Sequence, residues 1–154
     1  MPHCDLFSLP KSGALLGIDP GQRTLGLALS DTQRLIASPM KTLQRGRKLA
    51  PVLDQLFDLY DARSCVGIVL GLPLNMDGSS GPRTQATQAL AHQILKRQDV
   101  PLAFQDERLS SAEAERIMLA ADLSRARRAE KIDASAAAII LQTALDRLAN
   151  QKQD

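Results

Sequence analysis

The stretch from residue 14 to residue 31 most constrains what this chain can fold into. It is an apolar run that ends on Asp19, followed by a Pro20-Gly21 turn and a second apolar run that ends at Asp31. This pattern predicts two neighbouring β-strands joined by a tight turn. An ionised carboxylate at the tip of an apolar strand is costly unless a cation or hydrogen-bond donors compensate it. Asp19 is therefore a candidate site residue, or alternatively its side chain bonds local amides to shape the turn.

Length and composition bound the class of protein. A chain of 154 residues with 44% hydrophobic residues can bury one ordinary core. We therefore expect a single domain over residues 13–150, preceded by a flexible extension over residues 1–12. The net charge of +2 is too small to identify a nucleic-acid-binding protein by itself. No apolar run approaches the roughly 18 residues of a membrane span, and the two cysteines have no metal-ligand spacing, which favours a cytoplasmic protein without membrane contact.

The rest of the chain predicts an α/β order of elements. A short third strand is expected over residues 34–38, stopped by Pro39, which gives three adjacent antiparallel strands. Helical spacing of apolar residues and short apolar runs then predict, in order, a helix over 51–62, a strand over 65–70, a helix over 82–98, a strand over 102–104, a helix from Ser110 and a final helix from Asp133.

Carboxylates stand at the ends of these predicted elements. Asp106 and Glu107 follow the last strand, and because side chains alternate along a strand, only one of them is expected to point toward Asp19. Asp133 opens the last helix, where it is either a third member of this group or an ordinary N-cap. Three acids at one edge repel one another unless divalent cations lie between them, and oxygen ligands favour Mg²⁺ or Mn²⁺ over zinc. Two such ions are a known solution to phosphodiester hydrolysis.

Two further stretches suggest a binding surface. Four basic residues and no acid fall between Lys41 and Lys48, either as a nucleic-acid contact or as a solvated loop. The glycine-rich stretch 71–81 follows a predicted buried strand, where open α/β sheets usually place ligands, although a plain surface loop has the same composition. The chain contains no phosphate-binding glycine loop of the Walker type, no histidine-rich metal motif and no serine nucleophile elbow.

Five segments resemble the YqgF/RuvX family, and together they extend over nearly the whole chain. They are residues 17–21, 26–31, 71–78, 106–110 and 131–137. The family consists of bacterial proteins with a ribonuclease-H-like fold, called Holliday-junction-resolvase-like and assigned to 5′ processing of the precursor of small-subunit ribosomal RNA. The resemblance implies a mixed five-stranded sheet, with three antiparallel strands extended by two parallel ones and helices on both faces. One departure is Thr24, where many members carry a second basic residue after the position of Arg23.

The resemblance also implies roles for individual residues. Asp19, one acid of the Asp106-Glu107 pair, and Asp133 become catalytic residues that bind Mg²⁺ or Mn²⁺. We expect Glu107 to be the second acid, because it has the longer reach and because related resolvases use a glutamate there. Contacts to nucleic acid are expected from Arg23, Arg45, Arg47, Lys48, Asn75, Arg83 and Arg108. The expected substrate is structured RNA, foremost pre-16S rRNA, or branched DNA, with ribosomal particles as partners and a monomer or homodimer as the active form.

Two other classes of protein share parts of this pattern. Actin-like ATPases and sugar kinases carry a similar Asp-x-Gly hairpin, but they close two such domains around a nucleotide, and this chain has room for one. A non-catalytic module that binds RNA, ribosomal particles or the transcription machinery would keep the acids only as remnants. The complete set of acids favours the metal-dependent nuclease over both.

Overall fold

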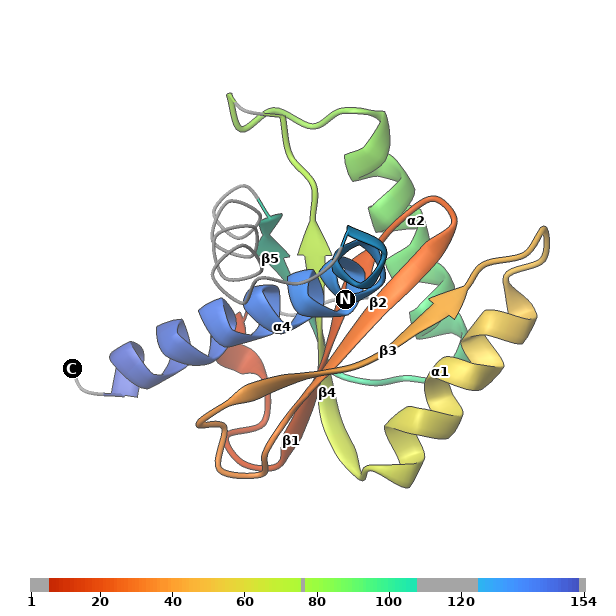
Figure 1. Cartoon of the computed structure of the whole chain (residues 1–154). Helices are drawn as coiled ribbons and strands as arrows, with labels where there is room; N and C mark the ends of the chain where they lie inside the picture. The colour runs from red at the N-terminus through yellow and green to blue at the C-terminus, as the bar shows by residue number, and fades with distance from the viewer. Residues whose placement is uncertain (1–5, 76, 108–124, 153–154) are drawn as a thin grey trace.

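The structure, a computed structural model, describes residues 6–75, 77–107 and 125–152, with backbone alone at 125–135 and 151–152 (Figure 1). The elements are, in chain order, a short 3-10 helix Leu6–Ser8, β1 (Ala14–Pro20), β2 (Thr24–Ser30), β3 (Ala37–Gln44), α1 (Ala50–Ala62), β4 (Cys65–Leu72), α2 (Pro82–Arg97), β5 (Leu102–Asp106) and α4 (Arg125–Lys152). The helix predicted from Ser110 lies outside the described residues.

The five strands form one mixed sheet in the order β3-β2-β1-β4-β5. β1 pairs antiparallel with β2, and β2 pairs antiparallel with β3. β4 pairs parallel with β1, and β5 pairs parallel with β4. The mixed sheet expected from the sequence is therefore confirmed, and β1 lies at its centre, where the antiparallel and the parallel halves meet.

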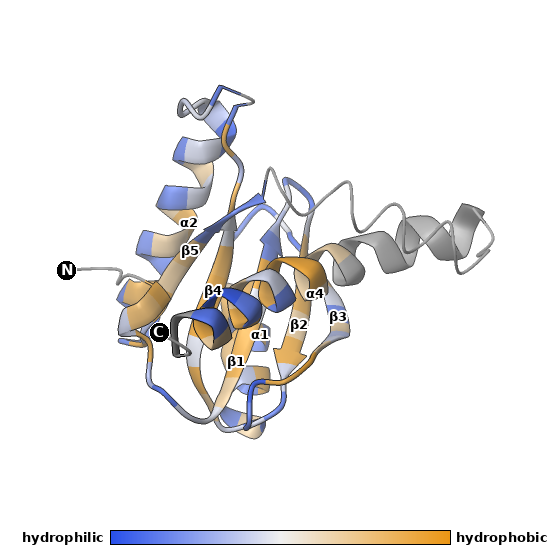
Figure 2. Ribbon diagram, turned by 90° about the vertical axis from the view of Figure 1, so that its left-hand side faces the viewer, coloured by the Kyte–Doolittle hydropathy of each residue, from blue (hydrophilic) through white to orange (hydrophobic). Residues whose placement is uncertain are grey.

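The sheet separates two hydrophobic cores. Alternate residues of β1 point to opposite faces, so that Leu16 and Ile18 join the core under α1 and α2, whereas Leu15 joins the core under α4. Figures 1 and 2 show α4 lying across the second face, over the largely hydrophobic strands β1 and β2. Helices on both faces explain why the central strands read as continuous apolar runs rather than as alternating ones.

Gly17 in β1 allows α4 to approach this face closely. A Cβ atom at this position would lie 2.8 Å from Cβ of Leu141 and 3.2 Å from the carbonyl oxygen of Ala137. Because Gly17 has no side chain, α4 can pack at this short distance from β1. This contact matters for the site because the helix approaches β1 two residues before Asp19.

The third strand differs from the prediction. It runs over Ala37–Gln44, so Pro39 lies inside the strand instead of ending it. Proline is tolerated there because β3 is an edge strand and its register against β2 shifts at Leu27/Ala28, beside the Ala28–Pro39 pair. Residues 31–36 form the connecting turn instead, in which the Asp31 carboxylate accepts hydrogen bonds from the amides of residues 35 and 36, at 2.7 and 3.0 Å.

α4 also begins earlier than predicted. It starts at Arg125, so Asp133 lies inside the helix and the N-cap interpretation of Asp133 is wrong. The apolar stripe used for the prediction starts only at residue 136, and the preceding basic turns carry no apolar signal that would have extended the helix. The buried positions Ala137, Ile140 and Leu141 agree with the predicted inner face.

The N-terminal segment is packed where it is described. We expected a flexible extension up to residue 12, but Leu6 and Leu9 are 3% and 4% exposed and belong to the core under α4. The two leucines lie three residues apart around a single 3-10 turn, which points both toward the sheet. Phe7 packs against the guanidinium of Arg147 at 5.7 Å from the ring centre. Within the described residues, every helix is too short or too polar to cross a membrane.

Candidate active site

The carboxyl ends of β1, β4 and β5 lie at one edge of the sheet, because these three strands are parallel. Asp19 is the penultimate residue of β1, and Glu107 directly follows β5. Asp19 alternates with Ile18, which places it on the α4 face together with Leu15. The sheet thus delivers both acids to one edge and one face.

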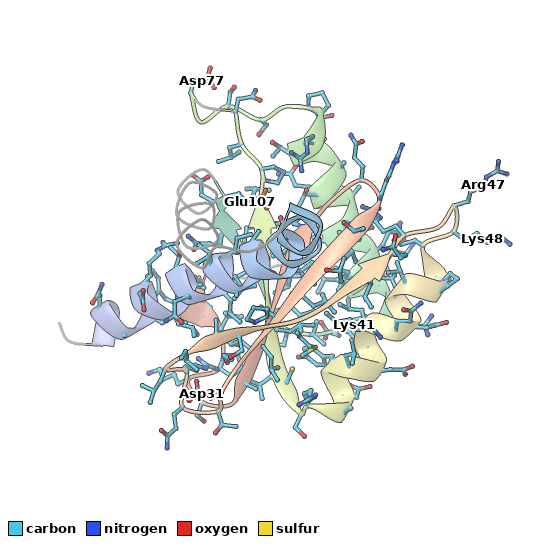
Figure 3. All side chains as sticks on the ribbon, viewed as in Figure 1. Asp31, Lys41, Arg47, Lys48, Asp77 and Glu107 are labelled. Carbon is cyan, nitrogen blue, oxygen red and sulfur yellow. The ribbon has the colours of Figure 1, made fainter. Side chains whose placement is uncertain are left out.

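Glu107, labelled in Figure 3, meets Asp19 at this edge, where the two carboxyl groups are joined by a hydrogen bond. Burial of Glu107, this hydrogen bond and the charge of Asp19 raise the pKa of Glu107 from 4.5 to about 9. Arg83 opposes this effect and Asp106 adds to it, so both lie close enough to act on Glu107 through their charges. Near neutral pH the pair therefore retains a proton, which Glu107 donates to Asp19.

Gly71 provides the space for this pair. It lies on β4, between β1 and β5, where it pairs with Gln105 one residue beyond the Ile18–Leu70 pair. A Cβ atom at this position would lie 2.9 Å from Cγ and Oε1 of Glu107 and 2.8 Å from Cδ1 of Ile140. The sequence analysis assigned this glycine to a loop and missed its role, although a glycine inside a strand often marks such a close approach.

Asp106 does not share the position of Glu107. It is the last residue of β5 and pairs with Leu72, and alternation places it on the face of Leu102 and Phe104, under α2. The structure thus brings one of the two neighbouring acids to Asp19, as alternation predicts. Gln105, on the α4 face, accepts a hydrogen bond of 2.7 Å from Arg147. This bond links β5 to α4, and no pattern in the sequence predicted it.

Asp133 is part of α4, one helical turn before Ala137. The carbonyl oxygen of Ala137 is the one that approaches Gly17, two residues before Asp19. Among the side chains that the structure describes, no group of three or more acids, histidines or cysteines could hold a metal ion. The described donor set is the Asp19–Glu107 pair, and two carboxylates with only oxygen atoms suit Mg²⁺ or Mn²⁺.

The predicted basic residues lie in different parts of the structure. Arg23 lies exposed in the β1–β2 turn, and its carbonyl oxygen accepts the amide of Arg45 at 2.8 Å. Arg47 and Lys48 are exposed in the loop after β3 and extend away from the sheet, far from Glu107 (Figure 3). Arg83 stands in the first turn of α2, and Arg108 lies outside the described residues.

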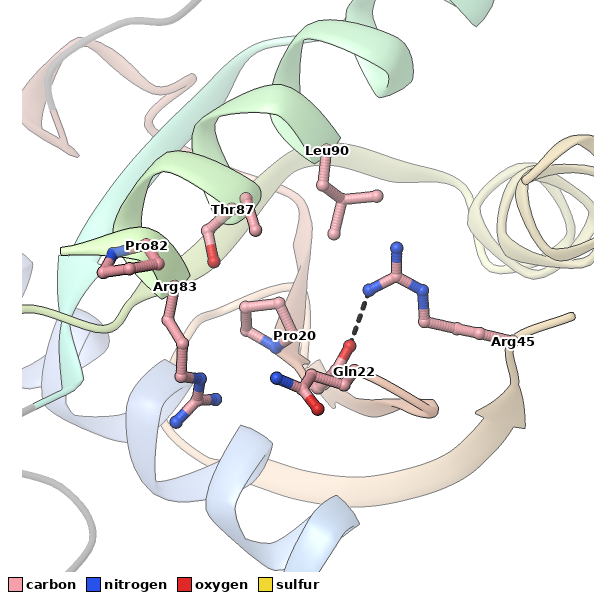
Figure 4. Close-up of a pocket in the computed structure, with 9 residues that line it drawn as sticks. Pro20, Gln22, Arg45, Pro82, Arg83, Thr87 and Leu90 are labelled. Atoms are coloured by element: carbon pink, nitrogen blue, oxygen red, sulfur yellow. Dashed lines mark hydrogen bonds between the residues drawn. The ribbon is translucent and has the colours of Figure 1, made fainter. Parts of the chain in front are cut away.

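A pocket of about 130 Å³ lies between the β1–β2 turn and the start of α2 (Figure 4). Arg45 and Arg83 enter it from opposite sides. Arg45 donates a hydrogen bond of 2.6 Å to the carbonyl oxygen of Gly21, which fixes its guanidinium against the turn. The other lining residues are Pro20, Gly21, Gln22, Pro82, Ala86, Thr87 and Leu90. Pro20 places the pocket one residue along the chain from Asp19.

The loop after β4 has a defined shape. Asn75 pairs with Ser79 through both backbone and side chain, at 2.9 and 3.1 Å, and Asp77 accepts hydrogen bonds from Ser79. Thr84 in the first turn of α2 donates its hydroxyl to the carbonyl oxygen of Pro73. The side chain of Asn75 is thus occupied within the loop, and the loop is tied to α2 next to the pocket. Gly71 and Leu72, which were expected to begin this loop, belong to β4.

Solved structures support the fold. The structure of Thermus thermophilus RuvC in complex with a Holliday junction substrate matches with a TM-score of 0.58 and 15% sequence identity, covering 89% of this chain and 96% of that one. A second structure of Thermus thermophilus RuvC matches with a TM-score of 0.55 and 14% identity, over 88% of this chain and 96% of that one. At such identities the likeness establishes a shared ribonuclease-H-like fold.

Sequence relatives are much more similar. A protein of Rhodobacter capsulatus named "Putative pre-16S rRNA nuclease" is 53% identical over 97% of this chain and 94% of that protein. A protein of Rhodospirillum rubrum with the same name is 47% identical over 100% of this chain and 98% of that protein. The RuvX family, described as a Holliday junction resolvase, matches residues 13–147. On the strength of this match and of these relatives, the chain belongs to the RuvX family.

Proposed function

We propose that this chain is a metal-dependent endonuclease that hydrolyses phosphodiester bonds in structured nucleic acid, carried by a single domain over residues 13–150. The observation that supports this proposal most is the Asp19–Glu107 pair, two carboxyl groups held together at the end of parallel strands. Such a pair is costly without a cation or a shared proton. A purely structural role would not require both acids at one half-buried position.

Asp19, Glu107 and Asp133 are the proposed ligands of Mg²⁺ or Mn²⁺. Asp19 and Glu107 fit such an ion because they supply oxygen atoms on one face of the sheet and because Gly71 leaves room beside Glu107. The helical position of Asp133, one turn before the close contact of Ala137 with Gly17, supports it as the third ligand. When bound, the metal supplies a water of lowered pKa and a positive charge beside the leaving oxygen, as one ion or as two.

The protein itself orients the acids and holds the substrate. β1 and the end of β5 fix Asp19 and Glu107 on one face, and α4 closes that face through Gly17. We assign Asp106, on the other face of β5, a supporting role through its charge on Glu107. Phosphate contacts are proposed for Arg23, Arg45, Arg47, Lys48, Arg83 and Arg108, with Asn75 shaping the loop beside them.

The proposed physiological reaction is 5′ processing of pre-16S rRNA in the cytoplasm, with ribosomal particles as partners and a monomer or homodimer as the active form. Support comes from the relatives named as pre-16S rRNA nucleases, with which the chain shares about half of its residues. A second candidate is the resolution of branched DNA, which the description of the family favours. Both candidates use the same site.

One assay separates these candidates. The purified chain is incubated with a structured RNA that carries the 5′ end of pre-16S rRNA and, in parallel, with a four-way DNA junction, each with Mg²⁺, with Mn²⁺ or with a chelator. We expect cleavage of the RNA with either metal and none with the chelator. Preferred cleavage of the junction would select the resolvase. Tight binding without cleavage of either substrate would select the non-catalytic module and overturn the proposal.

A further inference from the structure

The basic run after β3 is divided by the structure. Arg47 and Lys48 are exposed and extend away from the sheet, whereas Arg45 is half-buried and turns back onto the carbonyl oxygen of Gly21 (Figures 3 and 4). A long flexible side chain is held in one position only where contacts offset its lost rotamer freedom. Arg45 is therefore part of the wall of the pocket, and its two neighbours are surface charges.

Arg83 approaches the same pocket from α2. Figure 4 shows its guanidinium beside Gln22, across Pro20 from Arg45. No carboxylate lines the pocket, although Arg83 also acts on the nearby Glu107 through its charge. Two positive groups at one pocket favour a bound anion.

The pocket offers a small space beside these two cations. Its volume of about 130 Å³ leaves room for a phosphate group. The apolar side chains of Pro82, Ala86 and Leu90 offer packing for a sugar at the rim, and Gln22 and Thr87 add two polar groups to the lining.

We propose that this pocket seats a backbone phosphate of the substrate strand, next to the phosphate that is cleaved. The inference rests on the proposed nuclease function and adds the path of the nucleic-acid strand across the protein. Asp19 faces α4, while the next residue, Pro20, lines the pocket on the α2 side. The strand therefore crosses the carboxyl edge of β1, with one phosphate at Asp19 and Glu107 and its neighbour between Arg45 and Arg83. Recognition at this position depends on charge and shape and is independent of sequence.

The test is a binding cycle carried out without divalent metal, so that it does not depend on cleavage. The RNA and the DNA junction of the cleavage assay are synthesised with a single methylphosphonate linkage, which removes one charge, moved along the strand one linkage at a time. Wild type is compared with Arg45→Gln and with Arg83→Ala by fluorescence anisotropy. Arg63→Ala, which removes an exposed arginine at the end of α1, controls for total charge.

We expect one linkage whose neutralisation weakens binding of wild type and of Arg63→Ala about tenfold, the loss of one charge-assisted hydrogen bond. The same linkage should have no further effect in Arg45→Gln or in Arg83→Ala, and it should lie one nucleotide from the cleavage site of wild type. If both arginine variants remain as sensitive as wild type at every linkage, the proposal is overturned. Failure of wild type to cleave would instead overturn the nuclease function, because the binding cycle is read independently.

Arg45→Gln could also disturb the β1–β2 turn, because the side chain contacts Gly21. The hydrogen bond to Gly21 comes from Arg45 and not from Arg83. If Arg83→Ala alone loses its sensitivity to the neutral linkage, with an unchanged melting temperature, the proposed phosphate position is still supported. If only Arg45→Gln loses its sensitivity to the neutral linkage, and its melting temperature is also lowered, the effect comes from the disturbed turn. That result would overturn the proposed phosphate position.

Discussion

The carboxyl group of Glu107 is hydrogen bonded to that of Asp19 across strand β4, which separates their two strands. The pair can form because β4 carries Gly71, which has no side chain, at this point. Burial and the neighbouring acid keep a proton on Glu107, with its pKa raised to about 9. The two acids therefore share a proton, and a divalent cation bound by both would take the place of that proton.

Glu107→Gln should stabilise the metal-free protein at alkaline pH. The pKa of Glu107 rises from 4.5 to about 9 on folding, so the fold favours the protonated carboxyl group. The contribution of this group to the free energy of unfolding is fully present below pH 4.5 and is lost as the pH rises through 9. Glutamine keeps the neutral shape at every pH. A pKa raised by several units corresponds to several kcal/mol between pH 4.5 and 9, reduced by the partial exposure of Glu107. We therefore expect the variant to melt clearly above wild type at pH 9 and close to wild type at pH 5. Thermal melts in chelator across this range are the measurement, and a constant difference between the two proteins would contradict this role of Glu107.

Metal binding should release protons. Because Glu107 is protonated at pH 7.5 and a ligand carboxylate must be ionised, each bound metal displaces up to one proton there. Calorimetric titration with Mn²⁺ in two buffers of different ionisation enthalpy measures this number. We expect it to approach zero in Glu107→Gln, whatever affinity remains. An equal release in both proteins would assign the proton to another group.

Gly71→Ala should separate the two acids. The added methyl group would lie 2.9 Å from Glu107 and 2.8 Å from Ile140, so one of them must move. We expect a cost of about 1–3 kcal/mol in stability and a loss of metal-dependent cleavage. Gly46→Ala is the matched control, because a methyl group there meets nothing within 4 Å. Normal cleavage by Gly71→Ala, at a stability equal to that of the control, would show that the spacing of the pair is unimportant.

The basic run after β3 should act through charge. Replacing Arg45, Arg47 and Lys48 together by alanine should reduce the log–log salt dependence of binding by roughly two to three, at about 0.7–0.9 per lost phosphate contact. The cleavage rate at saturating substrate should fall much less. The slope is obtained from anisotropy titrations at several salt concentrations. An unchanged slope would mean that this run is merely a solvated surface.

Local patterns in the sequence predicted the strands, whereas the strand order came from the family resemblance and the choice of Glu107 from its reach and that resemblance. Strand alternation, together with the parallel arrangement implied by the family, places Asp19 and Glu107 at one edge and sends Asp106 to the other face. The separation of the two neighbouring acids follows from the period of two along a strand. The helical spacing of apolar residues predicted the buried face of α4 from residue 137 onward.

Features that depend on distant neighbours could not be predicted in this way. Pro39 ends a strand by local rules, but the position of β3 at the sheet edge tolerates it. The segment around Leu6 and Leu9 has no periodic pattern, and its burial follows only from the core under α4 that it contacts. The role of Gly71 depends on a side chain that follows the next strand in the sequence, and the contact of Arg45 with Gly21 depends on how the β1–β2 turn meets β3.

The measurement that tests the central claim most directly is the single-turnover, Mn²⁺-dependent cleavage rate of Glu107→Gln beside Asp106→Asn, each with its melting temperature. The account predicts that Glu107→Gln loses more than about 100-fold in rate while it melts at or above the wild-type temperature, because it loses a metal ligand and keeps its shape. Asp106→Asn should retain most of its rate and lose stability first. A wild-type rate for Glu107→Gln, or a collapsed rate for a fully stable Asp106→Asn, would contradict the assignment of the Asp19–Glu107 pair as the catalytic centre.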